Sequence, residues 1–96
     1  MLIWKDQALA DRDTILGYIA QDNPVAAIEI DERIEQRGEQ LLDKPNLGRR
    51  GRVDGTRELV AHPSYMLIYH VDAAGDIIVL RVLHTAQHWP DAQGNN

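Results

Sequence analysis

The chain has no cysteine and no phenylalanine among its 96 residues, and lysine occurs only at positions 5 and 44. Because cysteine is missing, disulfide frameworks, thiolate nucleophiles and cysteine-ligated zinc sites are excluded. Because phenylalanine is also missing, the core must be built mainly from Leu, Ile, Val and Ala. Apolar runs are far shorter than the roughly 20 residues of a membrane helix, and residues 1–6 turn polar too soon for a signal peptide. We expect a cytoplasmic protein that does not contact the membrane.

Positive charge is scarce and is concentrated in one stretch. The formal net charge is −5: residues 1–48 contain five Lys or Arg against ten Asp or Glu, whereas residues 49–96 contain five of each. An acidic chain repels a polyanion, so non-selective binding to DNA or RNA is disfavoured. A local basic patch still allows contact with a nucleic acid or with an acidic protein segment. The arginines of this patch lie among glycines, at Arg49, Arg50, Arg52 and Arg57.

The first half of the chain predicts a strand followed by two helices. Leu2–Trp4 is a short apolar strand, and Asp6 stands at the N-cap position of a helix over residues 7–21. Asn23 and Pro24 start a second helix, since Asn accepts a backbone N–H and Pro fits the first helical position. Its apolar face predicts an antiparallel hairpin with the first helix. That face consists of Ala27, Ile30, Ile34, Gly38 and Leu41.

Gly38 stands out on this face because glycine costs about 1 kcal/mol relative to alanine inside a helix. We interpret it as a point where the first helix approaches closely, with simple tolerance as the alternative.

The second half changes to the two-residue period of strands. Segments 56–60, Tyr65–Val71 and Ile77–His84 are rich in β-branched and aromatic residues and are separated by turn sequences. They predict an antiparallel β-meander whose last strand lies inside the sheet and is covered by the helices. Residues 47–52 are expected to form an irregular loop whose glycines are able to take positive φ.

Together these elements predict an α+β fold, with an N-terminal helical hairpin packed on a mainly antiparallel twisted β-sheet. We expect a single domain over residues 1–90 and a disordered tail over residues 91–96.

Two residues of the last strand are candidates for chemistry. On strict alternation Arg81 shares a face with Ile77, Val79 and Leu83, and His84 points the opposite way with Ile78, Leu80 and Val82. A buried arginine is costly unless it is paired, so Arg81 either pairs with a carboxylate such as Glu58 or opens onto a binding surface. His84 is a candidate general base.

No metal or cofactor is expected. His84 and His88 have the four-residue spacing of two metal ligands on a helix, but no third ligand has a clear position. Tyr65, Tyr69 and Trp89 either stack on bases or belong to the core and its rim.

The arginine stretch has two interpretations. Glycine-spaced arginines can present forked donors to carboxylates or phosphates, which makes Arg49, Arg50, Arg52 and Arg57 candidates for binding a target or a partner protein. The alternative is a solvated loop.

The order of strand, helical hairpin, arginine loop and β-meander resembles the RelE/ParE superfamily of bacterial type II toxin–antitoxin toxins, closer to its ParE-like members. The resemblance covers nearly the whole chain. It rests on Asp13 and residues 15–20, Asn23-Pro24, and residues 45–49, 55–60, 65–69, 82–84 and 89–90.

The resemblance implies a toxin neutralised by a cognate antitoxin, whose C-terminal segment wraps the sheet and the hairpin, in a complex that can form a larger hetero-oligomer. RelE-like members cut messenger RNA in the ribosomal A site, whereas ParE-like members inhibit DNA gyrase. RelE has an arginine where Met66 falls and a basic segment where residues 85–87 are neutral here. Gyrase inhibition is therefore favoured.

Two alternatives stay open. One is a ribosome-dependent endoribonuclease that uses Arg57, Arg81 and His84, and the other is a non-toxic relative that only binds the antitoxin.

Overall fold

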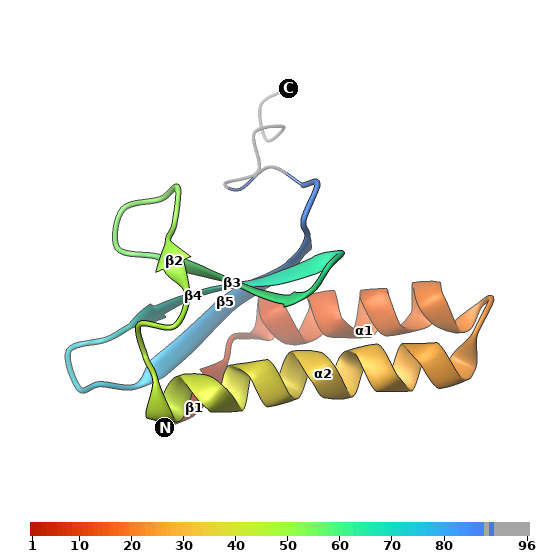
Figure 1. Ribbon diagram of the computed structural model, residues 1–96, viewed down its shortest axis with the longest axis horizontal. Coiled ribbons are helices and arrows are strands. Elements are labelled where there is room, and N and C mark those ends of the chain that lie inside the picture. The colour runs from red at the N-terminus through yellow and green to blue at the C-terminus, as the bar shows by residue number, and fades with distance from the viewer. Residues whose placement is uncertain (88, 90–96) are drawn as a thin grey trace.

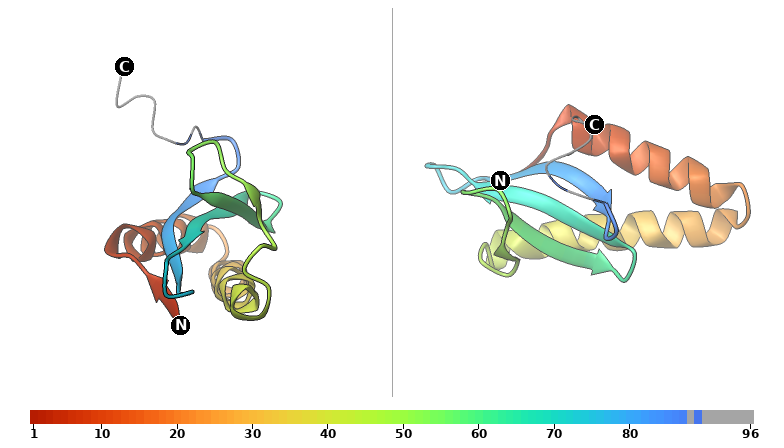
Figure 2. Two further views of the ribbon diagram at one scale, coloured as in Figure 1. Left: turned by 90° about the vertical axis from the view of Figure 1, so that its left-hand side faces the viewer. Right: turned by 90° about the horizontal axis from the view of Figure 1, so that it is seen from above.

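The computed structural model describes residues 1–87 and 89, which form two helices on one side of a five-stranded sheet (Figures 1 and 2). The strand order across the sheet is β1-β5-β4-β3-β2, with β1 parallel to β5 and the other neighbours antiparallel. The predicted α+β class, helical hairpin and β-meander are thus confirmed. In chain order the elements are β1 (Leu2–Trp4), α1 (Asp6–Ala20), α2 (Pro24–Asp43), β2 (Arg49–Arg50), β3 (Arg57–His62), β4 (Tyr65–Val71) and β5 (Ile77–His84).

Two of the predictions fall on residues outside the described part of the chain: the tail at 91–96, and His88 as a partner of His84. Among the described residues, no helix is long and apolar enough to cross a membrane.

The main core lies between the helical hairpin and the sheet. Ile34 and Leu41 of α2 meet Leu67 and Val79 of the sheet, and all four side chains are fully buried. Burying an aliphatic side chain of this size contributes about 1.5–3 kcal/mol. The other face of the sheet carries a smaller apolar cluster of Met66, Ile68 and Leu83, with Leu80 and Trp89 packed against it.

The two helix starts differ in how they are capped. Asn23 caps α2 as predicted, because its side chain accepts the Ala26 N–H at 3.1 Å and Pro24 follows it. Asp6 is the first residue of α1 and not its N-cap, so that prediction was wrong by one position. The N-cap is Lys5, whose N–H donates to Val79 O at 2.9 Å and extends the β1 ladder to the edge of the helix.

A β-bulge in β5 changes which residues share a face. Ile68 pairs with Arg81 and Tyr69 pairs with Val79, so Leu80 between them has no partner in β4. Side chains after the bulge therefore point to the opposite side from the one that strict alternation predicts. Arg81 shares a face with Leu83 but not with Ile77 or Val79, and His84 shares one with Val82 but not with Ile78.

Arg12 joins the hairpin to the first strand. Its Nε and Nη2 both lie 2.9 Å from the carboxylate of Asp31, and Nη2 also lies 3.2 Å from Glu35. Its guanidinium carbon lies 4.6 Å from the centroid of the Trp4 ring. The pKa of Arg12 is raised, and the hydrogen bond to Asp31 is the largest cause. The charged guanidinium of this α1 residue thus contacts both Asp31 of α2 and Trp4 of β1.

Gly38 is a point of close approach, but the neighbour is not the first helix. A Cβ added to Gly38 would lie 2.8 Å from Cζ2 of Trp4 and 3.6 Å from Leu2. The glycine therefore makes room for β1, which the sequence pattern of the helix alone does not reveal.

We predict that Gly38→Ala lowers the free energy of unfolding by about 1–3 kcal/mol, because the added methyl overpacks against Trp4 and outweighs the helix propensity of alanine. Urea denaturation of the purified protein measures this change.

Gly17→Ala is the matched control, since a Cβ at Gly17 meets nothing within 4 Å. This variant should be more stable by roughly 0.5–1 kcal/mol. Equal effects of the two substitutions would contradict the packing assigned to Gly38.

Candidate functional site

The arginine stretch forms a hairpin, which we call the arginine hairpin (residues 48–58). Residues 47–52 were predicted to be irregular, but Arg49 and Arg50 form β2 and pair with Glu58 and Arg57 of β3. Because side chains alternate along a strand, Arg49 lies on the face of Glu58 and Arg50 lies on the face of Arg57. The candidate arginines are therefore divided between the two faces of the sheet.

The buried carboxylate of Glu58 holds one part of this set. Glu58 is 3% exposed. It accepts from Arg49 Nη2 at 3.0 Å and from the backbone N–H of Arg52 at 3.3 Å, while Arg52 Nε lies at 3.8 Å. A buried carboxylate requires such partners, since an unpaired one costs several kcal/mol. Arg49 and the Arg52 backbone are thereby bound to the fold.

Arg57 supports the turn that follows α2. Its Nη1 donates to Gly48 O at 2.8 Å. The hydroxyl of Tyr69 donates to Pro45 O at 2.7 Å and accepts the Gly48 N–H at 3.0 Å. Burial is the main cause of the raised pKa of the Tyr69 phenol. The turn is thus fixed to the sheet by a fully buried tyrosine and an arginine.

Gly48 and Gly51 allow close approach, and neither uses the positive φ that glycine is able to take. Added Cβ atoms would lie 2.8 Å from the Tyr69 ring at Gly48 and against Thr56 at Gly51. Positive φ occurs instead at Gly55 and Gly75, with values of 84° and 87°.

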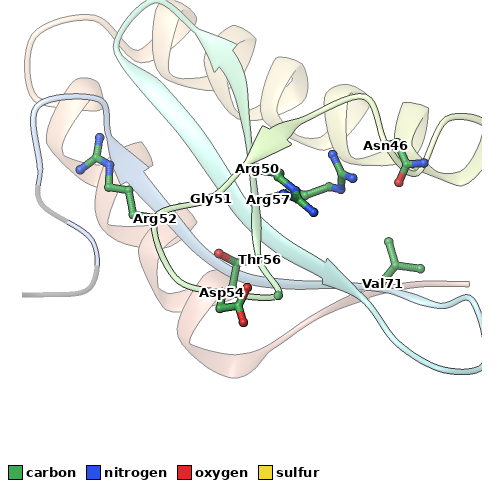
Figure 3. Close-up of a pocket in the computed structure, with 9 residues that line it drawn as sticks. Asn46, Arg50, Gly51, Arg52, Asp54, Thr56, Arg57 and Val71 are labelled. Carbon is green, nitrogen blue, oxygen red and sulfur yellow. The ribbon is translucent and has the colours of Figure 1, made fainter.

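A pocket of about 490 Å³ opens beside the arginine hairpin (Figure 3). It contains three of the four candidate arginines, and Figure 3 shows Arg50 and Arg57 next to each other with Asn46 and Val71 nearby. Its lining consists of Asn46, Arg50, Gly51, Arg52, Asp54, Gly55, Thr56, Arg57 and Val71.

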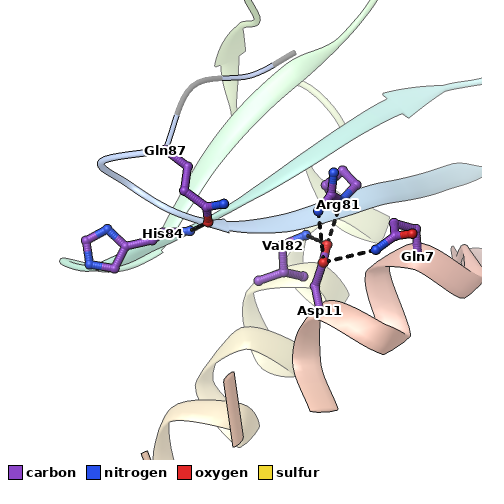
Figure 4. Close-up of polar contacts among 6 residues, drawn as sticks. All are labelled: Gln7, Asp11, Arg81, Val82, His84 and Gln87. Carbon is purple, nitrogen blue, oxygen red and sulfur yellow. Dashed lines mark hydrogen bonds and ion pairs between the residues drawn. The ribbon is translucent and has the colours of Figure 1, made fainter. Parts of the chain in front are cut away.

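Arg81 is paired with a carboxylate, but the partner is Asp11 and not Glu58 as suggested (Figure 4). Arg81 Nε and Nη2 lie 2.8 and 3.0 Å from the two Asp11 oxygens, and the Val82 N–H donates to Asp11 at 2.9 Å. Asp11 thus occupies the edge of β5 beyond the end of β1. The guanidinium also lies 6.0 Å from the Trp89 ring centroid.

His84 is held at the end of β5. Its Nδ1 accepts the Ala86 N–H at 3.0 Å, and its own N–H donates to Gln87 Oε1 at 2.7 Å (Figure 4). Its ring meets Tyr65 edge to face at 5.5 Å. A groove of about 590 Å³ between α1 and β5 is lined by His84, Arg81 and Tyr18, among others.

The three residues of the ribonuclease hypothesis are not all brought together. Arg81 and His84 line one groove, whereas Arg57 lies beside the other pocket. Arg57 pairs with Tyr69 and His84 pairs with Tyr65, which are four residues apart on β4, or roughly 13 Å.

Two of the three aromatic candidates belong to the interior, and the third, Trp89, is partly buried. Tyr69 is fully buried and Tyr65 is 8% exposed, so neither offers a face to a base. Trp89 packs against the cluster of Met66, Ile68 and Leu83. The described residues contain no group of three side chains able to hold a metal ion.

We predict that Asp11→Ala lowers the free energy of unfolding by about 2–4 kcal/mol, because it leaves Arg81 and the Val82 N–H without this acceptor. Asp11→Asn keeps a neutral acceptor and should lower the free energy of unfolding by less than Asp11→Ala does.

The control is Asp13→Ala on an exposed position of the same helix, which should change stability by less than about 0.5 kcal/mol. Urea denaturation of the three variants makes the comparison, and equal loss for Asp11→Ala and Asp13→Ala would show that the pair does not stabilise the fold.

We predict that Tyr69→Phe lowers the free energy of unfolding by about 1–3 kcal/mol at neutral pH, because Pro45 O and the Gly48 N–H lose their hydrogen-bond partner. A phenol whose pKa is raised by folding contributes stability that is present below pH 10 and is lost as the pH rises through the folded pKa. The difference from the native protein should therefore shrink above pH 10. Thermal melts from pH 7 to 11 measure it, with exposed Tyr18→Phe as the control that shows no such trend.

Comparison with known proteins identifies the family. Residues 2–89 match the sequence model of the ParE toxin of the type II toxin–antitoxin system parDE. The candidate toxin Y4kP of Sinorhizobium fredii is 39% identical over 88 residues, covering 91% of this chain and 90% of that protein. Toxin RelE2 of Caulobacter vibrioides is 35% identical over 86 residues, covering 90% and 96%.

The fold is also found among solved structures. A chain of the chromosomal ParDE toxin–antitoxin system from P. aeruginosa superposes with a TM-score of 0.77 at 24% identity, covering 86% of this chain and 92% of that one. The family model and the two toxin relatives span nearly all of the fold described above. The chain therefore belongs to the ParE toxin family of type II toxin–antitoxin systems, within the RelE/ParE superfamily.

Proposed function

We propose that this toxin inhibits DNA gyrase in the cytoplasm, arrests growth when it is free, and is neutralised by a cognate antitoxin. The observation that carries the proposal is the match of residues 2–89 to the ParE toxin model, in a chain whose arginines are not arranged around one reaction centre.

The chemistry of RNA cleavage supports this choice of target. Metal-free cleavage needs an activated 2′-hydroxyl and several positive groups around the scissile phosphate. Met66 lies where RelE has an arginine, and here it is buried with Ile68 and Leu83 in an apolar cluster. Arg81 is neutralised by Asp11, and Arg57 donates to Gly48 O. These side chains suit binding between proteins better than phosphate chemistry.

A RelE-type ribonuclease is the second candidate. It is favoured by the groove that Arg81 and His84 share, and by a relative named RelE2. In that case His84 would meet the substrate through Nε2. Because Nδ1 accepts the Ala86 N–H, Nε2 carries the proton of the neutral ring and would act as a general acid, and the general-base role would require this hydrogen bond to break.

The antitoxin is proposed by similarity. The ParDE system of P. aeruginosa and the RelBE2 complex of Mycobacterium tuberculosis are toxin–antitoxin systems with this fold. We propose that an antitoxin segment wraps the sheet and the hairpin, and that the complex can form a larger hetero-oligomer. The arginine hairpin is the proposed contact with the target or the antitoxin, through Arg49, Arg50, Arg52 and Arg57.

We predict that expression of the chain without its antitoxin arrests growth, and that the purified protein blocks supercoiling of relaxed plasmid by gyrase and leaves cleaved DNA complexes. Co-expression of the antitoxin should restore growth. His84→Ala should arrest growth and inhibit supercoiling to within about twofold of the native protein, because gyrase inhibition requires no histidine chemistry.

Normal supercoiling together with messenger RNA cut on ribosomes, and loss of that cleavage in His84→Ala, would establish the ribonuclease instead. Growth without arrest, with antitoxin binding intact, would identify a non-toxic antitoxin-binding relative.

A further inference from the structure

We infer that the pocket beside the arginine hairpin is a carboxylate-binding site that receives an acidic segment of a protein partner. This inference deepens the proposed role of the arginine hairpin as a protein contact, but it does not depend on which protein is the target.

The first argument is a juxtaposition of like charges. Arg50 and Arg57 are direct partners across the antiparallel pair of β2 and β3, and Figure 3 shows their side chains close together. Cross-strand partners have Cβ atoms about 5 Å apart, and like charges at this position destabilise the sheet. An anion placed between the two guanidinium groups would turn this repulsion into attraction.

The second argument is the number of unused donors. Within residues 1–87 and 89, the Arg50 side chain has no hydrogen bond or ion pair, and Arg57 uses Nη1 alone, toward Gly48 O. Arg50 and Arg57 lie together in the lining of this pocket, which also includes Asp54, whereas the Arg52 guanidinium lies toward Glu58, with Nε at 3.8 Å. Arginine binds carboxylates through two parallel hydrogen bonds, so the site has donors for at least one such group.

The third argument is that the hairpin is held in place before a ligand arrives. Gly51 N–H donates to Thr56 O at 2.8 Å, and Thr56 donates from its N–H and its hydroxyl to Val53 O at 3.1 and 2.6 Å. Glu58 fixes the Arg52 backbone from the other face. A site that is already ordered loses less entropy on binding.

The surroundings favour a carboxylate on a protein over a nucleic-acid phosphate. The chain has a net charge of −5 and only two lysines, so the molecule as a whole repels a phosphate backbone. Val71 adds an apolar wall, and the volume of about 490 Å³ suits a few side chains. A short acidic segment fits these features.

The test is an NMR titration of the purified chain with a capped octaglutamate peptide at low salt. We expect amide and arginine Nε–H shifts confined to residues 50–57 and Val71. Arg50→Gln should weaken binding about three- to tenfold, and Arg50→Lys should lie in between because it keeps the charge but loses the fork.

Arg33→Gln is the matched control, since it removes the same charge from an exposed position on α2. It should change the affinity by less than about twofold. Three results would overturn the inference: equal weakening by Arg33→Gln, no shifts at residues 50–57, or tighter binding of an eight-nucleotide thymidine oligonucleotide to the same amides. If the protein failed to block supercoiling by gyrase, the inference about the pocket would still stand, because the titration contains no gyrase.

Discussion

The buried carboxylate of Glu58 divides the arginines of the arginine hairpin into those that it binds and those that it does not. It lies on the sheet face away from the helices and draws Arg49 and the Arg52 backbone onto that face. The alternation of β2 and β3 then places Arg50 and Arg57 on the other face, beside the pocket. A basic loop that looks uniform in the sequence is thus divided into a part bound to Glu58 and a part that faces the pocket.

A second carboxylate, Asp11, does comparable work at the opposite edge of the sheet. Beyond the point where the three-residue β1 ends, Asp11 accepts the hydrogen bond of the Val82 N–H on β5, and it neutralises Arg81. This pair explains how an arginine is accommodated in an apolar strand. The groove of Arg81 and His84 and the pocket of Arg57 share no lining residue, which supports the proposed protein-binding function over RNA cleavage.

The sequence was sufficient for the fold class and for every element except β2, because those depend on local periodicity and on strong signals such as Asn23-Pro24. The last strand was also correctly placed in the interior, since both of its faces are apolar. What could not be predicted are features that depend on distant neighbours. Asp11 and Arg81 are 70 residues apart, and nothing in the spacing of either marks the other.

The errors share this cause. The bulge at Leu80 places the side chains of Arg81 and His84 on the sheet faces opposite to those predicted, and a leucine at that position does not indicate a bulge. Gly38 makes room for Trp4 and not for α1, because β1 runs beneath α2 in the folded sheet. The pocket combines Asn46 and Val71 with the arginines, and neither residue carried a signal of its own.

The division of the arginine hairpin by Glu58 is the central claim, and a pair of double-mutant cycles tests it most directly. One cycle combines Glu58→Gln with Arg49→Gln, and the other combines Glu58→Gln with Arg50→Gln, with urea denaturation giving each free energy of unfolding. The account predicts a coupling of about 1–2 kcal/mol for Arg49 and close to zero for Arg50. Equal coupling in the two cycles would contradict it.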